Sequence, residues 1–368
     1  MNDRDPNSTA GTDPSPNPSR GPMAPPPVPR PTRRSSATLL VVTFGALALF
    51  VLLIVSSFVG SLGQMVRGSS AAFEEALVDG NPRGKKKLLM IPVSGVILDG
   101  EAGPLGGSVV TSPWRIRRVL ELARKDDDIR GVLLLVNSPG GGVTASDTIL
   151  QELRTFKEES GLPIVAFFKD VAASGGYYVA MAADRIVSHP TGITGSIGVI
   201  MRMLNYRDLY AKLGLSEETI VSDDTPYKDM GSPTRKMRPD ERAKFEAILQ
   251  EMYERFVTIV DQGRPSLDTA TVRALANGSI YSAGEAKELG LVDTIGYREE
   301  ALSTLRELAE VDEDAPVVTY QQVPGLLESL LMKSGAGRSN AGIESGILER
   351  LLPSRSGLLY LWPGFGEN

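Results

Sequence analysis

The chain has 368 residues and a formal net charge of −6 at pH 7, a length that allows one large domain or two modest ones with extensions. This charge gives no support for nucleic-acid binding, because basic residues gather only in two short runs. The absence of cysteine excludes disulfides, thiolate metal sites and a cysteine nucleophile. The single histidine, His189, excludes a histidine-rich metal centre, so a serine hydrolase would need His189 or a different base.

The N-terminal part predicts a tail followed by a membrane anchor. Residues 1–36 are rich in Pro, Asn, Ser and Gly and cannot bury enough apolar surface to order, so we expect a disordered cytoplasmic tail. Residues 37–60 carry no charge and are long enough to cross a bilayer core of roughly 30 Å. Arg33 and Arg34 precede this segment, and the positive-inside rule then places the remainder of the chain outside. We expect an uncleaved, single-pass signal anchor in a bacterial inner (plasma) membrane, with an extracytoplasmic domain.

An α/β pattern follows a linker at residues 61–87, in which residues 71–78 have some helical character. Residues 131–136 and 164–168 are continuous apolar runs, the pattern of strands buried on both faces. Helical patterns between the strands indicate parallel pairing through right-handed crossovers. The predicted strands are 88–98, 131–136, 164–168, 184–187, 218–221 and 316–320, and the predicted helices are 114–123, 143–156, 206–213, 240–262, 267–276, 283–289 and 297–308.

Two further features concern the C-terminal third. Ser282 and Glu285 have capping-box spacing at the start of the helix at 283–289. Residues 321–368 read as a partly helical extension whose end, 358–362, is conspicuously apolar. Such an end needs a cover, which could be its own domain, a neighbouring subunit or the membrane, and we favour the first two.

The first stretch that could carry chemistry surrounds Ser174. Small apolar residues lead into this serine, and Gly175 and Gly176 follow it before a predicted helix. A serine between a strand and a helix N-terminus can expose its hydroxyl beside free backbone N–H groups, which suits a nucleophile and an oxyanion site. A small-residue turn without chemistry fits the same eight residues equally well.

A second stretch, residues 137–142, ends a buried strand with Asn-Ser-Pro-Gly-Gly-Gly and opens a helix. In open α/β sheets this edge is where ligands bind, and glycines let a substrate backbone approach closely. The residue pattern of a phosphate-binding loop is missing here, so nucleotide binding is disfavoured. An oxyanion hole or a docking edge for an extended peptide fits better, with a simple packing turn as the alternative.

Two more polar positions lie further along the chain. Ser196 sits in a small-residue turn, and Lys228 lies among small and polar residues. A lysine can replace histidine as the base for a serine only where desolvation lowers the pKa of its amine from about 10.4 toward neutrality. The hydroxyl of Ser196 could hold such an amine without restoring its charge, whereas Asp229 would restore it. We therefore expect Asp229 to point away from the amine, although Lys228 alone could be an ordinary surface lysine.

These motifs occur in an order that resembles the SppA family of bacterial signal peptide peptidases, in its short single-repeat form. The motifs are residues 137–141, 173–178, 195–199, 227–229 and 281–293, and the resemblance covers about residues 85–310. It implies an α/β fold of the ClpP/crotonase type, built from repeated β-β-α/βαβ units and spanning residues 88–320. It also implies a membrane-anchored serine protease that needs no metal or cofactor.

The resemblance carries residue roles onto this sequence. Ser174 matches the nucleophile and Lys228 the general base of a Ser/Lys dyad, and Ser196 matches the serine that orients the lysine. Gly140 and Gly175 match the oxyanion hole, and Gly141 and Gly142 are expected to line the substrate-binding edge. His189 departs from the family pattern, and a turn residue before Pro190 is its preferred interpretation.

The family also implies partners. Hydrophobic signal peptides are the implied substrates, the membrane is the implied location, and nucleic acid has no role. A ring-like homo-oligomer is implied, in which the lysine can come from a neighbouring repeat or subunit. Two alternatives stay open: a crotonase-type acyl-CoA enzyme and a catalytically silent membrane scaffold of the same fold.

Overall fold

The computed structural model describes residues 72–100, 110–323 and 358–361. The chain divides into the units Met1–Gly68 and Ser69–Asn368, and every described residue belongs to the second. The predicted tail at 1–36, the anchor at 37–60 and most of the extension at 321–368 therefore lie outside the described residues. Within the described ranges, none of the helices combines the length and apolarity that crossing a membrane requires.

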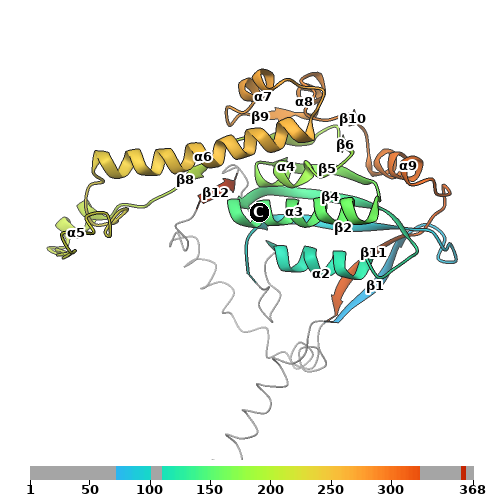
Figure 1. Ribbon diagram of the computed structural model, residues 1–368, viewed down its shortest axis with the longest axis horizontal. Helices are drawn as coiled ribbons and strands as arrows, with labels where there is room; N and C mark the ends of the chain where they lie inside the picture. Colours follow the sequence, from blue (N-terminus) through green and yellow to red (C-terminus); the bar gives the residue numbers. More distant parts are fainter. Residues whose placement is uncertain (1–71, 101–109, 324–357, 362–368) are drawn as a thin grey trace, which may run out of the picture. The chain divides into compact units, whose positions relative to one another are not determined.

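A single mixed sheet forms the centre of the second unit (Figure 1). Its strand order is β1-β11-β2-β4-β5-β6-β10, and β2, β4, β5 and β6 pair in parallel, as the sequence predicts. β1 is antiparallel to β11, its one neighbour among the described strands. The main-path strands are β1 (Ala72–Asp79), β2 (Lys87–Ile97), β4 (Ile129–Gly142), β5 (Ile164–Ala173), β6 (Arg185–Ser188), β10 (Thr294–Ile295) and β11 (Val317–Val323), and the others are β3 (Val110–Thr111), β7 (Ile193–Gly195), β8 (Ile200–Met201), β9 (Ile280–Ser282) and β12 (Leu358–Leu361).

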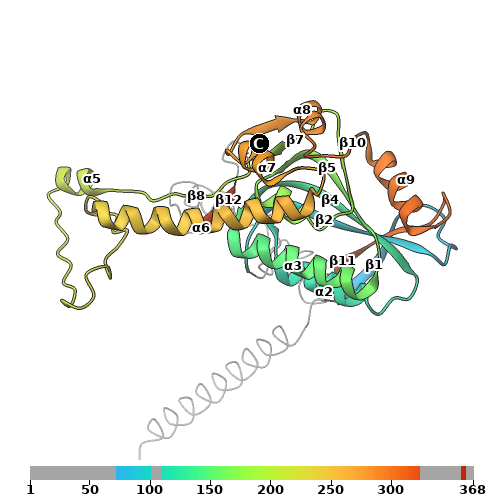
Figure 2. The same ribbon diagram turned by 45° about the horizontal axis from the view of Figure 1, so that its top comes forward.

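Helices cover both faces of this sheet (Figure 2). Alternate residues of β4 enter different cores: Val132 and Leu134 join the larger core with α2 and α3, while Leu133 joins the smaller core under α9. Burial on both faces explains why the central strands are continuous apolar runs rather than alternating ones. The helices are α2 (Pro113–Ala123), α3 (Val143–Ser160), α4 (Gly175–Ala180), α5 (Arg207–Lys212), α6 (Pro239–Gly263), α7 (Thr269–Leu275), α8 (Ala283–Glu288) and α9 (Arg298–Ala309).

The structure corrects three local predictions. Residues 72–78 of the predicted 71–78 patch are not helical, because β1 pairs with β11 there, and the sheet thus includes residues assigned to the linker. Residues 218–221 form no strand and are exposed or half-buried. The glycine-rich stretch 137–142 continues β4 instead of leaving the sheet, since β2 and β12 both pair with it. The predicted capping box at Ser282 and Glu285 is confirmed.

Candidate active site

Ser174 occupies a sharp turn between β5 and α4. Its backbone angles are φ 52° and ψ −116°, a conformation that side chains other than glycine rarely adopt and that costs about 1–3 kcal/mol. Two backbone hydrogen bonds hold it: its N–H donates to the Gly195 carbonyl (2.7 Å) and its carbonyl accepts from the Tyr178 N–H (2.8 Å). The surrounding backbone therefore forces the serine into a strained position, as at the nucleophile of many hydrolases.

The Ser174 hydroxyl does not cap the helix that follows it. Ser112 and Ser282 also precede helices, and each uses its hydroxyl to accept a bond from a helix N–H. Ser174 stands at the same position before α4 and makes no such capping bond. It is buried, with 1% of its surface exposed, so its hydroxyl lies inside the protein and not on an open surface.

Ser196 lies beside Ser174 through the pairing of β5 with β7. The last register pair of these parallel strands is Ala173 with Gly195, so each serine is the next residue of its strand. Ser196 also has a positive φ, 49°, and its N–H donates to the Ser279 carbonyl at 2.6 Å. The structure thus brings together the backbones of the two serines that the sequence predicts to act together.

Gly140 and Gly175 meet where β4 passes the start of α4. A Cβ atom placed on Gly175 would lie 3.0 Å from the Gly140 Cα and 3.1 Å from the Gly141 nitrogen, so no side chain fits there. Gly140 has φ 99°, and its N–H donates to the Ser138 Oγ at 3.1 Å. This amide must exchange its internal partner for a substrate oxygen if it is to serve as an oxyanion donor.

Lys228 is not brought to Ser174 within one chain. It is exposed, in a run of turns, and its neighbour Tyr227 packs under the Lys244 amine, 4.5 Å from the ring centroid. Lys244 lies near the start of α6, whereas Phe256, twelve residues later on that helix, contacts Tyr178 in α4 with ring centroids 4.9 Å apart. At 1.5 Å per residue, roughly 18 Å of helix separates the two contacts.

A cluster of ion pairs that the sequence did not predict anchors residues 226–235, called here the Lys228 segment, to the start of α6. Arg235 donates to the Asp229 carboxylate (2.7 Å) and to the buried Glu241 carboxylate (3.0 Å). These hydrogen bonds lower the pKa of both carboxyl groups below their ordinary values. Asp229 also contacts Arg238 at 3.4 Å, which agrees with the prediction that its carboxylate turns away from Lys228. In the sequence, Pro239 at the first helical position and Glu241 two residues later mark the start of α6, and this pattern is the signal that could have revealed the cluster.

Ser146 is a second residue that the sequence did not single out. It lies in the first turn of α3, is fully buried, and its Oγ has no hydrogen-bond partner among the described residues. That oxygen would be 2.5 Å from a Cβ on Gly175, so it borders the same junction of β4 and α4. By contrast, His189 is half-buried in a turn, where its Nδ1 bonds the Thr191 hydroxyl at 2.8 Å.

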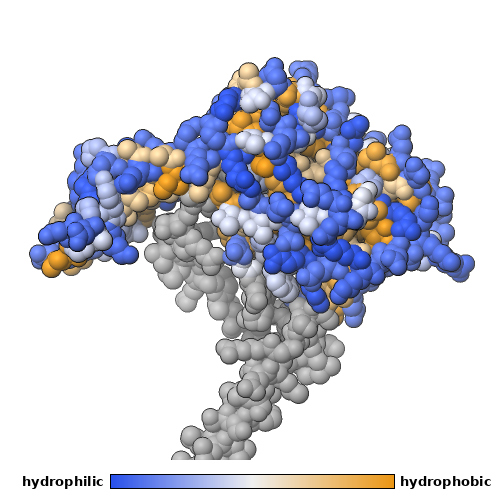
Figure 3. Space-filling model, in the orientation of Figure 1, coloured by the Kyte–Doolittle hydropathy of each residue, from blue (hydrophilic) through white to orange (hydrophobic). Residues whose placement is uncertain are grey.

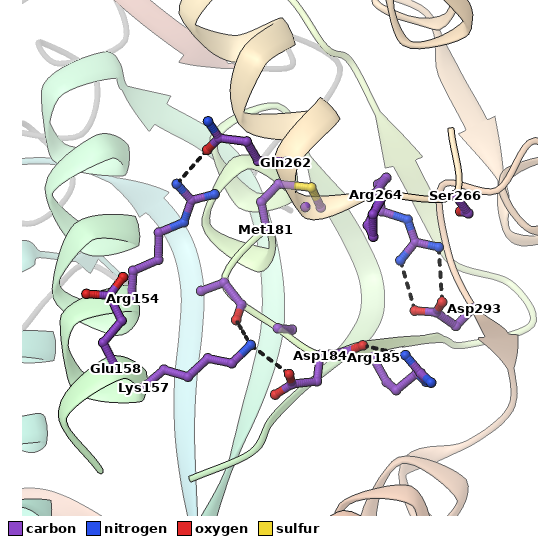
Figure 4. Close-up of a pocket in the computed structure, with 14 residues that line it drawn as sticks. Arg154, Lys157, Glu158, Met181, Asp184, Arg185, Gln262, Arg264, Ser266 and Asp293 are labelled. Carbon is purple, nitrogen blue, oxygen red and sulfur yellow. Dashed lines mark hydrogen bonds and ion pairs between the residues drawn. The ribbon is translucent and has the colours of Figure 1, made fainter. Parts of the chain in front are cut away.

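A separate hollow of about 840 Å³ lies between α3, the end of α4 and the end of α6, and Ser174 does not line it (Figure 4). Charged side chains face each other across it in pairs. Lys157 pairs with Asp184 at 2.7 Å, and Arg264 pairs with Asp293 at 2.9 Å. These ion pairs connect α3 and the end of α6 to the residues that precede β6 and β10. We assign no catalytic role to the hollow.

Comparison with known proteins identifies the class of enzyme to which the chain belongs. The model of "Peptidase family S49" matches residues 157–312. A signal peptide peptidase SppA of Enterococcus faecium is 38% identical over 260 residues, which cover 71% of this chain and 74% of that protein. A chloroplastic serine protease SPPA of Arabidopsis thaliana is 30% identical over 276 residues, which cover 73% of this chain and 39% of that protein.

Among solved structures, a mutant of ClpP1 from Listeria monocytogenes overlaps 58% of this chain and 94% of its own, with 16% identity and a TM-score of 0.36. The mixed α/β fold is established by the sheet itself, and its assignment to the ClpP/crotonase type stays a prediction.

These matches define the protein as a serine protease. The chain belongs to peptidase family S49 and is of the SppA type.

Proposed function

We propose that this protein is a membrane-anchored endopeptidase in which Ser174 and Lys228 form a Ser/Lys dyad that hydrolyses hydrophobic peptides, cleaved signal peptides among them. The observation that carries the proposal is the strained, buried Ser174, whose hydroxyl makes no capping bond beside the glycine junction. The relative from Enterococcus faecium is named a signal peptide peptidase, which supports this substrate class.

In the proposed mechanism Ser174 is the nucleophile and Lys228 is its general base. A neutral Lys228 amine removes the Ser174 proton as the hydroxyl oxygen attacks the peptide carbonyl. Backbone N–H groups at Gly140 and Gly175 stabilise the resulting oxyanion, and one such donor is worth about 2.7–4 kcal/mol. The lysine then protonates the leaving amine. A water molecule, deprotonated by the same lysine, releases the acyl group from Ser174.

We further propose that the lysine reaches each serine from a neighbouring copy in a ring. Roughly 18 Å of α6 separates the Lys228 segment from the contact with α4. Residues 204–220, which precede the turns around Lys228, expose large apolar side chains, and Figure 3 shows separate hydrophobic patches at the α5 end of the molecule and along α6. A second copy is the occupant that would bury them and complete the dyad. The exposed residues are Leu204 (51%), Leu209 (54%), Leu213 (63%), Leu215 (55%) and Ile220 (88%).

The experiment that tests this function compares the wild type with Ser174→Ala and Lys228→Ala on a fluorogenic apolar peptide and on casein. Each variant should lose at least about 10³-fold in kcat, because neither half of the dyad acts alone. Lys125→Ala, in the exposed turn after α2, is the matched control and should keep wild-type activity. If both dyad variants cleave as fast as the wild type, the protein uses another mechanism. If the wild type itself cleaves neither substrate, the protein is a silent scaffold.

The anchor and the extracytoplasmic location are part of the same proposal and have a separate test. Protease added to intact cells or spheroplasts should digest residues 61–368 and leave an N-terminal fragment that contains 1–60. Complete protection of residues 61–368, in cells whose known external domains are digested, would place the domain on the cytoplasmic side.

A further inference from the structure

The residues before Lys228 are held by side chains at the start of α6. The Tyr227 ring centroid lies 4.5 Å from the Lys244 amine and 5.9 Å from the guanidinium carbon of Arg238. These are cation–π contacts, in which a positive charge is attracted to the electron-rich face of a ring. Arg238 also donates a hydrogen bond to the Pro226 carbonyl at 2.7 Å. Tyr227 is thus held through its ring, and the residue before it through its backbone.

The residue after Lys228 is held by the ion cluster at the same helix start. The Asp229 carboxylate accepts a hydrogen bond from the Arg235 Nε at 2.7 Å, and the Asp229 carbonyl accepts one from the Arg235 Nη2 at 2.9 Å. Arg235 and Arg238 both contact the carboxylate of Glu241, which is fully buried in the first turn of α6. Because this carboxylate is buried and accepts from both arginines, it fixes the positions from which they hold the segment.

The backbone at Lys228 is closed by tight turns, whereas its side chain is left unbound. The Lys228 N–H donates to the Thr225 carbonyl at 3.0 Å, and the Met230 N–H donates to the Tyr227 carbonyl at 3.0 Å. Among the residues that the structure describes, the exposed Lys228 amine has no hydrogen bond, ion pair or ring contact. The lysine amine is therefore presented from a backbone that is fixed on both sides.

We propose that Tyr227 and Lys244 are positioning residues for the general base, because they fix the backbone from which the Lys228 amine reaches Ser174. The proposal rests on the Ser/Lys dyad proposed above and identifies what holds its lysine in place. Neither Tyr227 nor Lys244 takes part in the proton transfer. Their contact reduces the number of conformations open to the Lys228 segment, and the amine then spends a larger share of its time within reach of the nucleophile.

The location of the Lys228 segment explains why it needs such contacts. It lies at the end of α6 that projects away from the sheet in Figure 1, and roughly 18 Å of helix separates it from the contact of Phe256 with α4. Exposed turns with few buried contacts open readily. A lysine that enters the site of a neighbouring copy binds there at less entropic cost if its backbone is ordered beforehand.

Two substitutions of Tyr227 test the proposal through kcat on an apolar fluorogenic peptide. Tyr227→Phe keeps the ring and should keep kcat within about threefold of the wild type. Tyr227→Leu removes the ring and stays apolar, so kcat should fall at least about tenfold while KM stays within about twofold. Equal kcat values for the two folded variants, with Lys228→Ala inactive, would overturn this proposal and leave the dyad standing.

Substitutions of Lys244 test whether the contact with the ring is what matters. Lys244→Gln should lower kcat by about twofold to fivefold, the worth of one exposed cation–π contact, and Lys244→Arg should restore it. Tyr227→Leu/Lys244→Gln should be no slower than Tyr227→Leu alone, because both changes break the same contact. Lys125→Gln, in the exposed turn after α2, is the charge-removal control and should match the wild type. Losses that multiply in the double variant would contradict a shared role.

Hydrogen exchange separates this proposal from the dyad, because it requires no hydrolysis. The amides of Lys228 and Met230 should exchange at least about fivefold faster in Tyr227→Leu than in Tyr227→Phe, while the amides of β5 exchange equally in both. This difference is expected even if Lys228→Ala proves active, in which case the dyad fails and the hold on the segment stands. Equal exchange of the Lys228 and Met230 amides in the two variants would show that Tyr227 does not hold the segment.

Discussion

The junction of Gly140 and Gly175 offers a sharp test of the oxyanion site through Gly175→Ala. The added Cβ would lie 2.5 Å from the Ser146 Oγ, 3.0 Å from the Gly140 Cα and 3.1 Å from the Gly141 nitrogen. Carbon contacts normally need about 3.5–4.0 Å, so β4 and α4 must separate by roughly 0.5–1 Å. Gly140 and Gly175, which are expected to bind the oxyanion, would then be moved apart.

A displacement of this size predicts a large catalytic loss and a modest loss of stability. A misplacement of about 1 Å can cost 10²-fold in rate, and loss of one oxyanion donor costs about 10²–10³-fold. We therefore expect kcat of Gly175→Ala to fall about 100-fold on a fluorogenic peptide. Overpacking of this kind costs about 1–3 kcal/mol of stability, which urea unfolding will measure.

Two companion variants separate the catalytic effect from a general one. Gly284→Ala lies in helix α8, where the added Cβ would meet only the Ser282 Oγ at 3.9 Å, an ordinary contact, and it should keep wild-type kcat. In Gly175→Ala/Ser146→Ala the nearest contact is removed but the two backbone contacts remain, so stability should recover in part and kcat should not. A folded Gly175→Ala enzyme with kcat within threefold of wild type would refute the assignment of the oxyanion site.

Two further predictions concern Ser196 and the ion cluster at α6. Ser196→Gly should relieve the strain of its positive φ and stabilise the fold by about 1 kcal/mol, yet lower kcat, because the hydroxyl that orients the lysine is lost. Faster turnover, or thermal unfolding below wild type, would contradict this. Glu241→Gln should cost about 2 kcal/mol at pH 7, since Arg235 loses a charged partner. Arg235 holds the pKa of Glu241 below its ordinary value, so this stabilisation is complete above the unfolded carboxyl pKa and disappears as pH falls through the lowered folded one. Urea unfolding should show the difference at pH 7 and a smaller one at pH 3, and an equal difference at both would contradict the pairing.

The central strands were predictable because their pattern is local and strong. Residues 131–136 and 164–168 are apolar throughout, and both faces of these strands are buried. β1 was not predictable in the same way. Its residues, Ala-Phe-Glu-Glu-Ala-Leu-Val-Asp, include strong helix formers, and only pairing with β11, far along the chain, makes it an edge strand. Charged residues such as Glu74 suit such an edge, where they discourage pairing with other chains.

The residues of the candidate site also differ in whether local sequence determines their position. Ser174 and Gly175 lie at one local turn, and Ser196 joins them through neighbouring parallel strands, so residue pattern and sheet logic suffice. The position of Lys228 depends on how α6 projects from the core, and a sequence motif carries no information about that direction. The pairing of β12 with Gly140–Gly142 is non-local as well. The apolar end at 358–362 indicated a need for cover but not which edge of the sheet would supply it.

Mixing the two inactive variants tests the shared Ser/Lys site most directly. In a ring whose sites take Ser174 from one copy and Lys228 from the next, equal co-expression of Ser174→Ala and Lys228→Ala restores both residues in about a quarter of the sites. Co-purified mixed rings should therefore regain roughly a quarter of wild-type kcat on an apolar peptide, while each variant alone stays inactive. Mixed assemblies that remain as inactive as either parent would contradict a dyad shared between copies.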